Sequence, residues 1–207
     1  MTRQMANPAF RREQQQRLHE PRIAPITDLI DSLRSDEEWL PYVAPIHGGI
    51  DARMMTVLRD PGPKTRQGTG SGMLCTENDD QTAAKQCELM AGAGLVPSDL
   101  TPWNAYPWYI NRAPSKAQIR RAAPALASMV ALMPKLRVVL LAGRDAQAAW
   151  DVAAQQEPLL RNSGLVVLRT FHASAQALQT SDPLERARRI DHRVMTWNEA
   201  GRIVRMG

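Results

Sequence analysis

The sequence has few cysteines, few aromatic residues and no long apolar run. Its two cysteines, Cys75 and Cys87, cannot by themselves form a four-cysteine zinc or iron–sulfur site. No segment approaches the roughly 20 consecutive apolar residues that cross a bilayer, and residues 1–20 lack the apolar core of a signal peptide. We therefore expect a cytoplasmic protein with free thiols, no membrane association, and neither a metal nor a cofactor.

The length and the net charge of the chain indicate how many domains it forms and what kind of partner it binds. The chain has 207 residues and a formal net charge of +5. This length suits one hydrophobic core, so we predict a single domain over residues 1–207. The excess of basic residues is compatible with a polyanionic partner such as DNA, although many basic proteins bind no nucleic acid.

Apolar patterns predict helices that alternate with short buried strands. Residues 1–25, rich in Arg, Gln and Pro, are expected to form an extended arm or a frayed helix. The predicted strands cover residues 54–58, 100–104, 137–142 and 165–171. The predicted helices cover residues 26–40, 115–133, 145–155 and 183–199. A further helix is predicted to begin after the capping residues 76–80 and to end at Gly92 or Gly94. This alternation predicts an α/β fold, a three-layer α/β/α sandwich around a mostly parallel four-stranded sheet.

Polar residues follow each predicted strand. In open parallel sheets, ligands bind beyond the carboxyl ends of the strands. The segments to consider for function are therefore Asp60–Pro63, Asn104–Trp108, Gly143–Asp145 and His172–Ser174.

Three short motifs resemble those of the uracil-DNA glycosylase superfamily. They are Leu58–Pro63 (LRDPGP), Thr101–Asn104 (TPWN) and Phe171–Ser174 (FHAS), and they stand in the family's order within residues 46–178. In that family the first motif has Asp or Asn before Pro, a central strand ends in a base-reading Asn, and the last motif reads His-Pro-Ser. The resemblance implies a monomeric DNA-repair glycosylase that hydrolyses the N-glycosidic bond of uracil or a related damaged base in DNA and leaves an abasic site.

Asp60 and His172 are the expected catalytic residues. Asp60 can activate a water molecule and offset positive charge that develops on the sugar, and His172 can donate a hydrogen bond to the departing base. The alternatives are a turn former before proline and a histidine satisfied by local backbone groups. Ala173 and Ala175 replace prolines that are customary in the family, so the sequence does not by itself make the His172 loop rigid.

Other residues are expected to bind the substrate. Asn104 has a carbonyl and an amide, so it can match the adjacent acceptor and donor atoms of a uracil-like edge, or it can instead cap a turn. The backbone of Pro61 and Gly62 and the hydroxyl of Ser174 are suited to contacts with phosphate or base.

Base stacking and base extrusion have less obvious candidates. Relatives place an aromatic ring after the Gly-rich loop, where this chain has Leu74. Tyr106 or Trp108 are candidates to stack on the base from another wall, although aromatic residues after a strand are more often core. Gln176 and Leu178 are the candidates for a wedge that extrudes the nucleotide.

Two other functions remain open. The first is a catalytically weak protein that binds a modified base or abasic DNA on the same fold, which the missing ring favours. The second is a nucleotide-processing hydrolase that uses arginines to hold phosphate. Salt-sensitive affinity for long DNA would argue against the second, because a nucleotide pocket makes few phosphate contacts.

Overall fold

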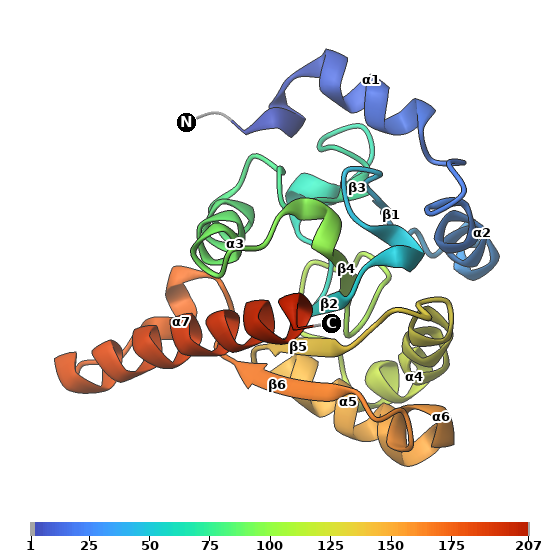
Figure 1. Ribbon diagram of the computed structural model, residues 1–207. Coiled ribbons are helices and arrows are strands. Elements are labelled where there is room, and N and C mark those ends of the chain that lie inside the picture. Colours follow the sequence, from blue (N-terminus) through green and yellow to red (C-terminus); the bar gives the residue numbers. More distant parts are fainter. Residues whose placement is uncertain (1–2, 207) are drawn as a thin grey trace.

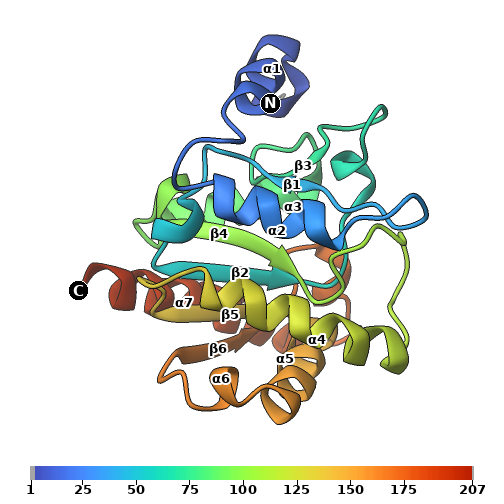
Figure 2. The same cartoon turned by 90° about the vertical axis from the view of Figure 1, so that its right-hand side faces the viewer.

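Four parallel strands form the central sheet of the computed structural model, which describes residues 3–206 (Figures 1 and 2). The strand order is β4-β2-β5-β6, and all three pairings are parallel. These strands are β2 (Met54–Leu58), β4 (Leu100–Asn104), β5 (Val138–Ala142) and β6 (Val166–Thr170). A smaller parallel pair joins β1 (Tyr42–Val43) to β3 (Met73–Leu74).

Helices cover both faces of the sheet, which confirms the predicted three-layer sandwich. One apolar cluster joins the sheet to α2 (Ala24–Leu33), α4 (Lys116–Ala131), α5 (Arg144–Gln156) and α6 (Pro158–Arg161). A second joins the other face to α3 (Gln81–Gly92) and α7 (Pro183–Arg205). Since side chains alternate along a strand, Met55 and Val57 belong to the first cluster and Met54 to the second.

The register of the strands brings their carboxyl ends level. Leu58 of β2 is paired with Asn104 of β4, and Ala142 of β5 is paired with Thr170 of β6. The loops that follow these strands therefore begin along one edge of the sheet, which is where ligands bind in folds of this kind.

The predicted strands are present within two residues of their expected ends, but two helices differ from the prediction. The helix predicted over 26–40 ends at Leu33, because Arg34 is extended and a tight turn joins Ser35 to Glu38. The last helix continues beyond 199 to Arg205. Among the helices of residues 3–206, none combines the length and apolar character that crossing a bilayer requires.

The N-terminal segment is more ordered than an extended arm or a frayed helix. Asn7 caps α1 (Pro8–Gln16) by accepting a hydrogen bond from the backbone N–H of Ala9. Gln14 is buried, and its Oε1 accepts from the backbone N–H of Ile46 at 2.7 Å. This side-chain contact attaches α1 to the β1 region, and the polar composition of the segment did not predict it.

His47 predicts how the stability of the fold depends on pH. It is fully buried, its Nδ1 lies 3.2 Å from the carbonyl of Pro97, and its Nε2 accepts from the N–H of Thr76. Burial lowers the pKa of His47 from 6.5 to about 4. The folded state holds His47 in its neutral form, whereas the unfolded chain protonates it below its ordinary pKa of 6.5. The stability that the neutral His47 contributes is therefore fully present above pH 6.5 and is lost as the pH falls toward about 4.

The loss expected from His47 is roughly 3 kcal/mol, since each pKa unit corresponds to about 1.4 kcal/mol. Chemical unfolding at a series of pH values should show this decline, and His47→Gln should reduce it to the part that comes from other groups such as His172, whose pKa is also lowered. A wild-type unfolding free energy that stays constant from pH 6.5 to 4 would contradict the expectation.

Candidate active site

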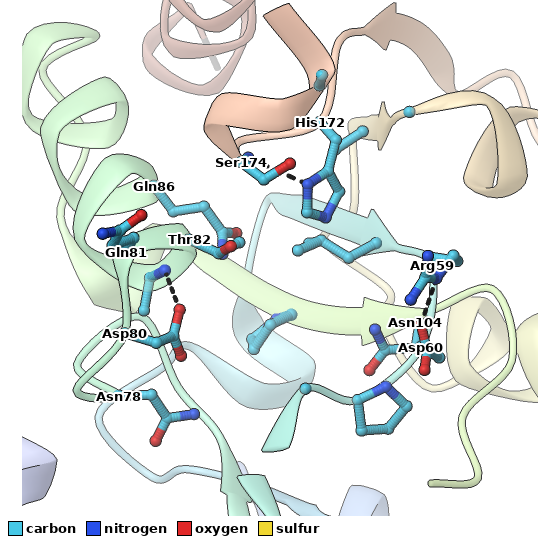
Figure 3. A pocket seen from close by; sticks show the side chains of 18 of the residues that line it. Arg59, Asp60, Asn78, Asp80, Gln81, Thr82, Gln86, Asn104, His172 and Ser174 are labelled. Carbon is cyan, nitrogen blue, oxygen red and sulfur yellow. Dashed lines mark hydrogen bonds and ion pairs between the residues drawn. The ribbon is translucent and has the colours of Figure 1, made fainter. Parts of the chain in front are cut away.

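A cleft of about 1180 Å³ lies at the carboxyl edge of the sheet (Figure 3). It is lined by the loops after β2, β5 and β6, by the end of β4, and by β3 and the start of α3. Most of the predicted site residues line it: Asp60, Pro61, Gly62, Leu74, Asn104, His172, Ser174 and Gln176. The strand-end residues predicted from the sequence are thus brought together.

Asp60 contributes a buried carboxylate to the cleft. Its side chain is only 4% exposed, and its Oδ1 accepts a hydrogen bond from Nε of Arg59 at 2.5 Å (Figure 3). Burial raises the pKa of Asp60 above 3.8, against the opposing effects of Arg59 and of a hydrogen bond from the backbone of Arg112. The carboxylate lines the cleft, where it can accept a proton from a water molecule.

His172 presents a neutral imidazole with a defined tautomer. Its Nδ1 accepts a hydrogen bond from the backbone N–H of Ser174 at 3.1 Å. The proton of the neutral ring is therefore on Nε2, which can donate to a ligand. Burial, together with the charges of Arg59 and Arg193, lowers the pKa of His172 to about 4, so the ring is neutral at physiological pH.

Gly143, just after β5, supports the His172 side chain. Its φ is +97°, and a Cβ atom added there would lie 3.2 Å from Cβ of His172. Gly143→Ala should therefore displace the imidazole in addition to straining the backbone. For a reaction in which this imidazole takes part, we expect about a tenfold fall in kcat, together with about 1 kcal/mol lower unfolding free energy.

Gly164→Ala is the matched control for that substitution. Gly164 also has a positive φ, +69°, but a Cβ there would meet open space. The Gly164→Ala substitution should reduce the unfolding free energy without affecting kcat. Denaturant unfolding and steady-state kinetics measure these two quantities. Equal kcat values for Gly143→Ala and wild type would show that Gly143 does not support His172.

Asn104 lies beside Asp60 at the end of β4 (Figure 3). It is 3% exposed, and its Oδ1 has no hydrogen-bond partner among residues 3–206. A buried amide oxygen without a partner is costly. An N–H group on a bound ligand would satisfy it.

The wall of the cleft formed by α3 was not predicted to be part of the site. Asp80 caps α3 through the N–H of Ala83, and Asn78 and Gln86 are buried beside it (Figure 3). The sequence indicated residues 76–80 only as helix caps. Nothing in the sequence shows that β3 brings these caps to the cleft, because that strand has only two residues.

Three residues that the sequence offered as site candidates do not line the cleft. Tyr106 is 2% exposed, packs against Trp108 with ring centroids 5.1 Å apart, and accepts a hydrogen bond from Arg121. Trp108 is also core, so neither ring can stack on a base. Leu178 is 7% exposed, in a short 3-10 turn that packs against α7. The predicted role of Tyr106 in substrate binding and of Leu178 as a wedge is therefore wrong.

The chain gives no match to known family models or to curated proteins. What the cleft can do therefore depends on its own groups. It combines a buried carboxylate of raised pKa, a neutral imidazole that donates from Nε2, and an amide oxygen that has no partner within the described residues 3–206. Such a set can activate water, stabilise negative charge on a leaving group, and recognise a flat polar edge.

Proposed function

We propose that this protein is a monofunctional DNA glycosylase of the uracil-DNA glycosylase type, which hydrolyses the N-glycosidic bond of uracil or a related damaged base. The observation that carries the proposal is the presence of Asp60, Asn104 and His172 in one cleft at the sheet edge. The three motifs that resemble this superfamily supply the same three residues.

The proposed reaction assigns one step to each catalytic group. Asp60 accepts a proton from a water molecule whose oxygen forms the new bond to C1′ of the sugar. The C1′–N bond breaks, and its electron pair moves onto the base. Asp60 also offsets the positive charge of the oxocarbenium-like transition state, while the Nε2–H of His172 donates to the base oxygen that becomes negative. A neutral donor suffices, which agrees with the low pKa of His172.

Asn104 and Leu74 would hold the base during this step. The amide oxygen of Asn104 accepts from the ring N–H of a uracil-like edge and its amide nitrogen donates to the neighbouring oxygen, whereas cytosine offers the opposite pattern. Leu74 lines the cleft at 8% exposure and supplies an apolar surface where relatives have a ring. Gln176, which is exposed on the cleft rim, is the remaining wedge candidate.

Two cations at the cleft are positioned to bind DNA phosphates. Lys64 and Arg144 line the cleft, and neither has an acidic partner among residues 3–206. Lys64→Gln and Arg144→Gln should each reduce the slope of log K against log salt by about 1 for duplex DNA. Fluorescence anisotropy at several salt concentrations measures this slope.

Lys135→Gln is the control for these cation variants. Lys135 pairs with Asp51 at 2.8 Å and precedes β5, at the opposite end of the sheet from the cleft. Its removal should leave the slope unchanged. If all three variants give the same slope as wild type, DNA does not follow the cleft rim.

A binding protein for modified or abasic DNA is the second candidate function. Leu74, in place of a stacking ring, favours it, because the base would be held less firmly in the orientation needed for cleavage. Tight binding to damaged DNA without release of a base would support this alternative.

A substrate panel tests the proposed function. The protein is incubated with oligonucleotides that contain uracil, hypoxanthine, xanthine or hydroxymethyluracil, and alkali then cleaves any abasic sites. Strand cleavage at one or more of these bases is expected. Intact strands with all four bases would rule out the proposed activity.

A further inference from the structure

A buried arginine holds the loop that carries His172. Arg193, on α7, is 5% exposed. Its Nη1 donates to the carbonyl of His172 at 3.1 Å and to the carbonyl of Ala173 at 3.3 Å. We propose that Arg193 is a positioning residue for His172, an inference that rests on the proposed function for its catalytic meaning but not for its structural content.

The contacts restrain the loop on both sides of the imidazole. Arg193 donates hydrogen bonds to the backbone carbonyls of His172 and Ala173. The backbone N–H of Ser174 donates to Nδ1 of the imidazole. On the other side, His172 lies so close to Gly143 that a Cβ atom added at Gly143 would press on it. Hydrogen bonds from the neighbouring helix α7 therefore restrain the loop. In the family that the sequence resembles, prolines in the loop would restrict its backbone instead.

Arg193 is a costly residue to bury if it serves only to pack the core. Its Nε has no hydrogen-bond partner among residues 3–206, and no carboxylate there forms an ion pair with its guanidinium. Burial lowers the pKa of Arg193, and the charge of Glu88 on α3 only partly opposes this. An apolar side chain of similar length would avoid the desolvation cost, so packing alone does not explain an arginine at this position.

The charge of Arg193 acts on His172 as well. The charged groups that face His172 are Arg59 after β2, Asp145 on α5 and Arg193 on α7. The two arginines disfavour the imidazolium, and Asp145 favours it. Arg193 therefore both orients the ring and helps to keep it in the neutral form that donates from Nε2.

Titration of the histidines by NMR tests this directly. The chain has four histidines, and His172→Ala identifies the signal of His172. In wild-type protein this signal should titrate at about 4. Arg193→Met should raise the midpoint by about one pH unit. Arg188→Met, an equal charge change at an exposed position of α7, should leave it unchanged.

Kinetics with the same variants separates positioning from general stability. Arg193→Met should lower kcat by about 10- to 100-fold and change KM by less than about threefold. Arg193→Lys retains the charge but cannot hold both carbonyls in the same geometry. It should keep the low midpoint of His172 and give a kcat between those of Arg193→Met and wild type.

Each outcome is decisive for the proposal. An unchanged His172 midpoint in folded Arg193→Met, or a wild-type kcat in that variant, would overturn it. If Arg193→Met does not fold, Arg193→Lys decides, and a wild-type kcat in Arg193→Lys would overturn the proposal. If wild-type protein releases no base, the proposed function fails, and the midpoint of His172 then tests the positioning role alone.

Discussion

Asp60→Asn should slow base release by about 10³-fold or more while changing DNA affinity by less than about threefold. Asparagine preserves the size of the side chain but can neither accept a proton from water nor offset positive charge on the sugar. Asp60 has only 4% of its side chain exposed, so water cannot screen its charge effectively. Its raised pKa adds to its strength as a proton acceptor.

Single-turnover kinetics with excess enzyme measures this effect, and anisotropy measures the affinity. Asp80→Asn is the matched control, because it removes another carboxylate that lines the cleft while asparagine still caps α3. Its rate should stay within about fivefold of wild type. If Asp60→Asn loses affinity as much as rate, Asp60 contributes to binding and not to the chemical step.

His172→Ala should lower kcat by about 10²- to 10³-fold, since it removes a preorganised donor to the departing base. The pH profile gives an independent check. Because the pKa of His172 is about 4, wild-type activity should show no loss from histidine protonation near pH 6.5. Acidic loss from His172 should occur only at lower pH, where the imidazole takes up a proton.

His192→Gln is the control for this prediction. His192 is exposed on α7 and contacts the ring of Phe171, with centroids 5.6 Å apart. Its replacement should leave both kcat and the pH profile unchanged. An acidic limb near pH 6.5 that disappears in His172→Ala would show that His172 titrates near its ordinary value, and it would contradict the lowered pKa. Activity that is lost as the pH rises through 6.5 would show instead that the imidazolium form is the active one.

The strands and their carboxyl ends could be predicted from sequence, because short apolar runs that end at Asp60, Asn104 and His172 are a local signal. Parallel topology then follows from the alternation with helices, and it brings these ends together. The cleft residues of the three motifs were found in this way. The protonation state of His172 was not, because it depends on burial and on the charges of Arg59 and Arg193, which lie far away in the chain.

The missed and incorrect assignments have a common physical cause. Tyr106 and Leu178 follow strands or motifs closely, but tertiary packing turns both side chains into the core. Arg193 lies on α7, whose sequence is rich in arginine. The fold nevertheless buries Arg193 beneath the His172 loop. The direction of a side chain near a loop is set by contacts over long sequence distances, which local patterns do not contain.

The His172 loop shows how one sequence departure is offset in three dimensions. Ala173 and Ala175 take positions where the resembling family has prolines. Hydrogen bonds from Arg193 to the loop carbonyls and from the Ser174 N–H to the ring supply the restraint instead. The absence of those prolines therefore does not weaken the proposal that His172 is held for catalysis.

A single-turnover experiment with a uracil-containing oligonucleotide is the sharpest test of the proposed glycosylase activity. It compares the release of free base by wild type and by Asp60→Asn. Wild-type protein should release the base and leave an abasic site in the strand, and Asp60→Asn should do so about 10³-fold more slowly. No release by wild type, or equal rates for both proteins, would contradict this expectation.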